Sequence, residues 1–217
     1  LVRLSGPGGH TARPHLTADL VCALSKIVTE LPAALSRRGD PRAGLSLVWG
    51  RISAGSAPNA IPDDGVVEGT LRCLDDEAWH AAPDVVKELL DSVVAAYGVQ
   101  AELDYRRGVP PTINEPNSVE IFRAACVQVL GEQAVAATPQ SLGGEDFAWY
   151  LETTPGAYAR LGTHWGNSDR PMLDLHRGTF DVDETAIGVG TRFMVATALA
   201  ALRAEQRGGL DDTAEAD

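Results

Sequence analysis

The stretch GLSLVWGRISAGSAPNAIPDDGVVEGTLRCL (residues 44–74) decides the fold, because it holds two strand patterns joined by a turn-rich loop. The first pattern, GLSLVWGRIS, includes Val48, Trp49 and Ile52 and is typical of a strand. The second, VVEGTLRCL, alternates between two faces: Val67, Leu71 and Cys73 on one, and Glu68, Thr70 and Arg72 on the other. The loop SAPNAIPDDG contains the Pro, Asn, Asp and Gly residues of turns. We therefore expect an antiparallel pair of strands.

Helical patterns lie on both sides of this pair. Apolar residues follow helical spacing from Leu20 to Leu35 and again from Val86 to Tyr97. The segments LVRLSG at the start of the chain and VQAELDYRR after the second helix have the character of strands. The order β-α-β-β-α-β across residues 1 to about 108 predicts a ferredoxin-like domain, with an antiparallel sheet and two helices on one face.

A change in composition at GVPPTINEPN predicts a domain boundary. We expect a ferredoxin-like domain over residues 1–110, a second α/β domain over 111–205, and a disordered tail over 206–217, which makes an α+β chain overall. The second domain shows helical patterns around Val119–Leu130, at GGEDFAWYLE and at Asp183–Arg203, and one short strand pattern, AYARLG. These strands are too few for a complete sheet. The chain also has no initiator Met, so we expect it to be the C-terminal part of a longer polypeptide.

The composition argues against several classes of partner. A net charge of −12 disfavours nucleic acid, whose binding depends on Lys and Arg. By inspection, no run approaches the apolar length of a membrane span, and the first residues lack the layout of a signal peptide. The three cysteines show no Cys-x-x-Cys spacing, which favours free thiols in a reducing compartment. We therefore expect a cytoplasmic protein that binds neither nucleic acid nor membranes.

Three positions in the first domain are candidates for function. His10 lies in GGHTARPH, a Gly-rich turn that could cradle an anion at a helix N-terminus or could simply be a tight turn with exposed histidines. Asn59 could bind a carbonyl or carboxylate through its amide, or could serve the turn. Arg72 could clamp a carboxylate, or could be a surface charge paired with Glu68. Local pattern alone favours the simpler interpretation at each position.

The second domain adds carboxylates and one histidine. Glu145 and Asp146 in GGEDF are expected in the first turn of a helix, where acids complement the dipole, although they could also bind a metal or support a ligand residue. His176 in DLHRGTFDVDE lies in a long polar loop among acids such as Asp174, which is typical of a metal ligand. One histidine makes no metal site by itself.

Four segments in this order, GGHTARPHLTAD, APNAIPDDGVVEGTLR, SLGGEDFAWY and DLHRGTFDVDE, resemble the dinuclear-metal amidohydrolase and peptidase family of aminoacylases, hippurate hydrolases and auxin-conjugate hydrolases. The N-acyl-amino-acid amidohydrolase branch is the most similar. The resemblance runs from Leu1 to about Arg203. It implies a ferredoxin-like lid or dimerisation domain followed by the C-terminal portion of an α/β metallohydrolase catalytic domain. The family's Asp-x-His segment and general-base glutamate have no counterpart in this sequence.

The resemblance also implies roles for the candidate residues. His10 matches the catalytic lid histidine that stabilises the oxyanion, commonly in the partner subunit's site. Asn59 and Arg72 match substrate-binding positions, His176 matches a metal ligand, and Glu145 and Asp146 lie next to the site.

The implied activity is hydrolysis of N-acyl amino acids or similar small amides. The implied cofactors are two divalent ions (zinc, manganese, cobalt or nickel), and the implied assembly is a homodimer formed through the lid. Two other hypotheses remain open: a non-catalytic dimerisation or ligand-binding module that has lost the metal-binding half, and an anion-binding regulatory domain.

Overall fold

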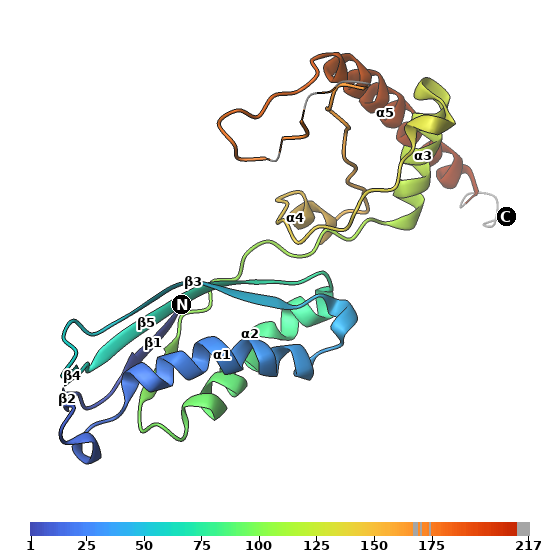
Figure 1. The fold of residues 1–217 in the computed structure, drawn as a ribbon. Helices are drawn as coiled ribbons and strands as arrows, with labels where there is room; N and C mark the ends of the chain where they lie inside the picture. Colours follow the sequence, from blue (N-terminus) through green and yellow to red (C-terminus); the bar gives the residue numbers. More distant parts are fainter. Residues whose placement is uncertain (167–168, 170, 174, 212–217) are drawn as a thin grey trace. The chain divides into compact units, whose positions relative to one another are not determined.

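The computed structural model describes residues 1–166, 169, 171–173 and 175–211, which form two compact units (Figure 1). Unit 1 comprises Leu1–Pro111 together with Ser141–Asp146. Unit 2 comprises Thr112–Gln140 and the chain from Phe147 onward. Each unit is described by itself below.

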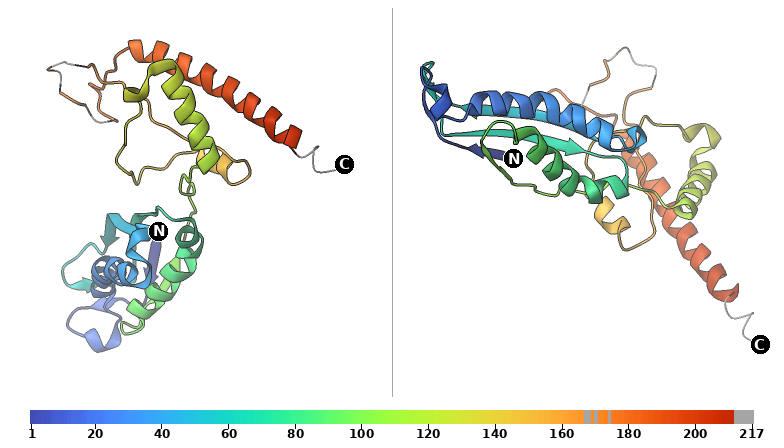
Figure 2. Two further views of the ribbon diagram at one scale, coloured as in Figure 1. Left: turned by 90° about the vertical axis from the view of Figure 1, so that its right-hand side faces the viewer. Right: turned by 90° about the horizontal axis from the view of Figure 1, so that it is seen from below.

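Unit 1 is built on a four-stranded antiparallel sheet. Its strands are β1 (Val2–Ser5), β3 (Ser46–Ala54), β5 (Asp64–Arg72) and β6 (Gln100–Leu103), in the spatial order β3-β5-β1-β6. Two helices, α1 (Leu20–Arg38) and α2 (Asp76–Val94), cover one face of the sheet (Figures 1 and 2). This order and layering confirm the predicted ferredoxin-like fold.

The core of unit 1 lies between this sheet and its two helices. Alternate sheet residues meet the apolar stripes of the helices, and the buried set includes Val2, Leu4, Leu24, Ile27, Val67 and Leu90. Asp19 and Asp75 cap the two helices by accepting hydrogen bonds from the backbone N–H groups of Cys22 and Ala78. The helix predicted from Val86 therefore begins earlier, at Asp76.

A second, smaller sheet lies at one end of unit 1 (Figure 1). It pairs β2 (Gly9–His10) with β4 (Ala60–Ile61), and the 3₁₀ helix η1 (Pro14–Leu16) follows β2. Another 3₁₀ helix, η2 (Pro41–Ala43), leads from α1 into β3. The small sheet brings the GGHTARPH turn against the loop that contains Asn59.

Unit 2 is mainly helical, with α3 (Pro116–Leu130), η3 (Glu132–Ala134), the four-residue α4 (Ala148–Leu151) and α5 (Thr185–Asp211). Helices α3 and α5 pack together, and the rings of Phe122 and Phe193 meet edge to face at 5.4 Å. Glu115 caps α3 by accepting hydrogen bonds from the backbone N–H groups of Asn117 and Ser118.

Three predictions for this part of the chain were wrong. Residues 157–162 form no strand, because the described part of unit 2 offers them no partner strand. The GGEDF segment precedes α4 rather than opening it. Helix α5 continues to Asp211, so residues 206–211 of the predicted tail are helical, and residues 212–217 lie outside the described residues.

Helix α5 exposes much apolar surface. Its exposed apolar side chains are Ile187, Met194, Val195, Leu199 and Leu202. By length and composition alone, the stretch Thr185–Ala204 could cross a membrane, with a mean hydropathy of 1.5. The expectation that no run approaches the apolar length of a membrane span was wrong, because Ala and larger apolar residues raise the average of a stretch that includes Arg192. One such helix is weak evidence for a membrane span.

Candidate functional site

The small β2–β4 sheet fixes the backbone at His10. His10 pairs with Ala60 across this sheet. The next residue, Thr11, donates from both its backbone N–H (3.1 Å) and its Oγ1 (3.3 Å) to the carbonyl oxygen of Asn59. The turn that presents His10 is therefore held mainly by backbone groups.

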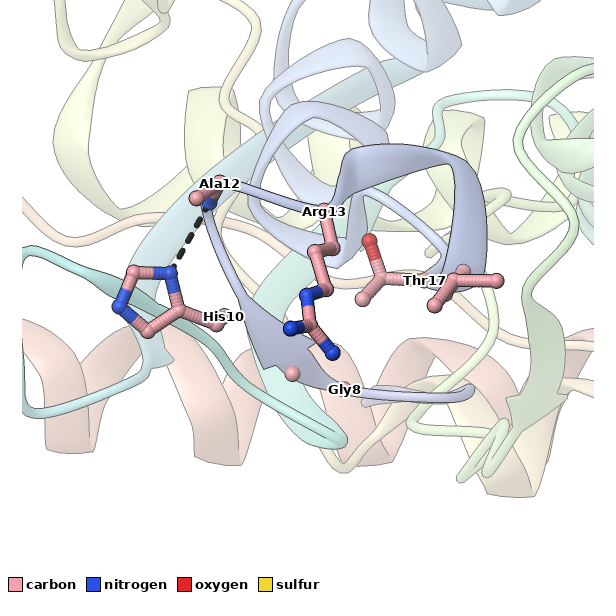
Figure 3. Close-up of a pocket in the computed structure, with 7 residues that line it drawn as sticks. Gly8, His10, Ala12, Arg13 and Thr17 are labelled. Atoms are coloured by element: carbon pink, nitrogen blue, oxygen red, sulfur yellow. Dashed lines mark hydrogen bonds between the residues drawn. The ribbon is translucent and has the colours of Figure 1, made fainter.

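The imidazole of His10 is oriented by its own turn. The backbone N–H of Ala12 donates to His10 Nδ1 over 3.0 Å (Figure 3). An Nδ1 that accepts a hydrogen bond carries no proton, so neutral His10 holds its proton on Nε2. The exposed His10 side chain thus presents an Nε2–H donor.

Gly8 allows the two sides of this turn to approach closely. A Cβ at this position would stand 2.7 Å from the carbonyl oxygen of Ile61 and 2.9 Å from the backbone nitrogen of Asp63. Neither atom can move away as a flexible side chain could. Close backbone approach therefore explains the first glycine of the GGH motif.

A hollow of about 500 Å³ lies beside His10 (Figure 3). It is lined by Gly8, Gly9, His10, Ala12, Arg13, Leu16 and Thr17. Its size falls within the range of small-molecule sites. The lining contains one guanidinium and one imidazole but no carboxylate.

Asn59 contributes its backbone to this site. Its carbonyl oxygen is the acceptor for Thr11, and its exposed side chain has no hydrogen-bond partner within the described part of the chain. The amide is therefore available to a ligand, and its predicted role in substrate binding stays a prediction.

Arg72 lies far from His10 in the same chain. It ends β5, whereas β4 and His10 adjoin the other end, and nine residues of strand span about 26 Å. Its Nη1 donates to the carbonyl oxygen of Leu142 over 2.8 Å, while Glu68 pairs with Arg51 at 2.8 Å instead. Substrate binding by Arg72 also stays a prediction.

Glu145 and Asp146 belong to the segment that Arg72 holds, since Ser141–Asp146 is part of unit 1. Gly144 comes close to Val109, which would stand 2.9 Å from a Cβ at that position. The structure therefore brings together Arg72 and the Ser141–Asp146 segment at one end of unit 1, and His10 and Asn59 at the other.

His176 lies in unit 2, in an exposed turn. Its φ of 68° is left-handed, a conformation that histidine adopts more readily than most residues. Among the described residues, His176 belongs to no group of three or more potential metal ligands. Asp174, which was expected to support it, lies outside the described residues. His176, the ligand candidate from the sequence, therefore does not by itself fit a dinuclear metal centre.

Arg13 is the lining residue that sequence reasoning missed. It stands three positions after His10, inside the motif that was singled out, and it is the only charged side chain of the hollow. The sequence did show a cation within a Gly-rich turn. Only the structure shows that this turn encloses a hollow and that Arg13 lines it.

Comparison with known proteins places this geometry in a family. The profile described as peptidase family M20/M25/M40 matches residues 17–200. A Rhodococcus jostii protein named "Putative glutamate--cysteine ligase 2-3" is 45% identical over 195 residues, which are 90% of this chain and 24% of that protein. N-acetyl-L-cysteine deacetylase of Bacillus subtilis is 31% identical over 211 residues, covering 97% of this chain and 49% of the relative.

A solved structure is also similar. The crystal structure of a dinuclear metal binding peptidase of the M20 family from Bacillus subtilis has a TM-score of 0.71 and 28% identity, covering 93% of this chain and 50% of that one. The chain spans about half the length of several curated relatives that it matches, and about a quarter of the Rhodococcus jostii protein. The resemblance of the four motifs is thus confirmed: the chain belongs to peptidase family M20/M25/M40.

Proposed function

We propose that this chain is the lid and C-terminal part of a metal-dependent amidohydrolase that acts on N-acyl amino acids or similar small amides. Hydrolase activity of the amidohydrolase type is supported at the level of the family. The finer assignment rests on the site around His10, with Asn59 and Arg72 as further substrate-binding residues.

One observation carries the proposal: the Ala12 N–H bond that leaves His10 with a proton on Nε2. Hydrolysis of an amide develops negative charge on the carbonyl oxygen, and a fixed donor aimed at that oxygen lowers the barrier. His10 can serve as this donor while neutral, because its tautomer is already set. No proton has to leave or reach Nδ1.

A dinuclear metal site needs more ligands than the one that we assign to this chain. His176 is the ligand that we assign to this chain, and we infer that the others lie in the part of the relatives' length that it does not span. Divalent ions bound there would activate the attacking water. Zinc, manganese, cobalt and nickel all suit mixed nitrogen and oxygen ligands.

A homodimer through the lid is part of this proposal. Arg72 ends β5, and His10 adjoins the opposite end of that strand, which is about 26 Å long; this separation is too large for both residues of one chain to touch one small substrate. If both act on the same molecule, they must come from different copies. We also infer a cytoplasmic location from the free thiols, and no nucleic-acid partner from the acidic charge.

The substrate to test first is N-acetyl-L-cysteine, because a relative over 97% of this chain is named for its deacetylation. The longest natural polypeptide that contains this chain would be purified with its metal, and acetate release would be measured. His10→Ala should lower kcat by about 10²- to 10³-fold, with the metal content unchanged. His176→Ala should lower the metal occupancy measured by elemental analysis.

Three results would contradict the proposal. An inactive natural polypeptide would favour the non-catalytic module. Loss of metal in the His10→Ala variant would exclude a pure donor role for that residue. Full occupancy in the His176→Ala variant would exclude His176 as a ligand.

A further inference from the structure

Arg13 has no role in the proposed function, although it lies beside the donor. Figure 3 shows its guanidinium between the imidazole of His10 and Thr17, over Gly8. Among the residues that the structure describes, no hydrogen bond or ion pair engages this guanidinium. It is an unpartnered cation inside a hollow.

Most cations of unit 1 are partnered. Six are in ion pairs: Lys26–Glu30, Arg38–Glu88, Arg42–Asp40, Arg51–Glu68, Lys87–Asp91 and Arg106–Asp104. Arg72 donates to Leu142, and Arg107 donates to His80 and lies over the Trp79 ring. Arg3 and Arg37 also lack a partner in the described residues, but neither lines the hollow beside His10.

The rest of the lining suits a small ligand with one acidic end. Leu16 offers an exposed apolar side chain, and Gly8, Gly9 and Ala12 add little bulk. Thr17 already donates its hydroxyl to the carbonyl oxygen of Pro14. A guanidinium without a carboxylate neighbour matches the fork of a ligand carboxylate.

We propose that Arg13 binds a carboxylate of the amide substrate while the Nε2–H of His10 donates to the scissile carbonyl oxygen. This inference rests on the proposed function and deepens it, because it selects small amides with an acid group close to the scissile bond. In one chain, Arg13 and not Arg72 is the cation beside the donor. Arg13 is thus a specificity-determining residue.

The test compares two substrates that differ only at the acid group: N-acetyl-L-cysteine and N-acetyl-L-cysteinamide. The natural polypeptide should prefer the acid. Arg13→Met should lower that preference in kcat/KM by about 10- to 100-fold, the effect of one charge-assisted hydrogen bond. Arg13→Lys should retain part of the preference. Arg37→Met, an unpartnered arginine at the end of α1, is the matched control and should change neither substrate.

An equal loss for both substrates would mean that Arg13 supports the turn, and no loss would mean that it does not bind the acid; either result overturns the inference. Binding of both compounds, followed through the NMR signals of His10, separates this inference from the proposed function. If the natural polypeptide hydrolyses neither compound, the proposed function fails. Tighter binding of the acid by wild type than by Arg13→Met then still supports the carboxylate site, and equal binding overturns it.

Discussion

Arg72 donates from Nη1 to the carbonyl oxygen of Leu142 over 2.8 Å, and so ties the Ser141–Asp146 segment to the end of β5. The two residues lie 70 positions apart in the sequence. This bond makes a segment with Glu145 and Asp146 part of the ferredoxin-like unit. Arg72 therefore has a structural role whatever it does with substrate.

Arg72→Met should loosen this segment. We expect a loss of about 1 kcal/mol locally, or roughly fivefold in the opening equilibrium of residues 142–146, measured by hydrogen exchange. Arg51→Met is the control, because its exposed ion pair with Glu68 lies on the same sheet and contributes little. Unchanged exchange at 142–146 in Arg72→Met would show that the bond does not hold the segment.

The tautomer of His10 can be observed directly. At alkaline pH, where imidazole is neutral, ¹⁵N NMR should show an unprotonated Nδ1 and a protonated Nε2, because the Ala12 N–H occupies Nδ1. His15, which follows in η1, has no such bond within the described residues and serves as the internal reference. A proton on Nδ1 of His10 would contradict the donor geometry.

Gly8→Ala should destabilise the β2–β4 turn. The new Cβ would meet the backbone of Ile61 at 2.7 Å, and we expect a cost of about 1–3 kcal/mol in the free energy of unfolding. Gly108→Ala is the control, since nothing lies within 4 Å of its Cβ position. Urea denaturation measures both, and equal stability of the two variants would contradict the close approach.

Glu115 makes unit 2 sensitive to acid. Hydrogen bonds from Asn117 and Ser118 hold the pKa of Glu115 below its ordinary value. A depressed folded-state pKa gives stability that is present above the unfolded pKa and is lost as the pH falls through the folded pKa. Glu115→Gln should therefore lower Tm near neutral pH. The difference from wild type should begin to shrink as the pH falls below about 4, the ordinary range of a glutamate, and should vanish once the pH is below the depressed folded-state pKa. A difference that is the same at neutral pH and below the folded-state pKa would contradict the role of this charge.

The ferredoxin-like unit could be predicted from sequence because its signals are local. The alternating pattern of β5 and the helical spacing of α1 each place apolar side chains on one face, and these two faces pack against each other in the core. The start of α2 was missed because Pro83 suggests a break in the helix. In the structure the helix continues on the N-terminal side of Pro83, where Trp79 and Ala82 extend its buried apolar stripe. In unit 2, the strand predicted at 157–162 failed because strand pairing depends on a neighbour, which local pattern does not contain.

The candidate site was predictable as a set of residues but not as an arrangement. His10, Asn59 and Arg72 were found from their motifs, whereas their division between the two ends of unit 1 follows from the direction and length of β5. Arg13 escaped notice because a lone arginine in a turn means little until the hollow around it is known.

In the turn at His10, the hydrogen bonds that fix the backbone are separate from the Arg13 side chain, so the side chain can change during evolution while the backbone stays constant. Backbone groups hold its frame: Ala18 donates to Pro7, Thr11 to Asn59 and Gly6 to Asp63. Because the frame does not depend on the Arg13 side chain, that residue can be exchanged while the imidazole keeps its orientation. On the proposed function, new substrate preferences can thus arise by single substitutions at Arg13, while the backbone frame that orients His10 stays unchanged.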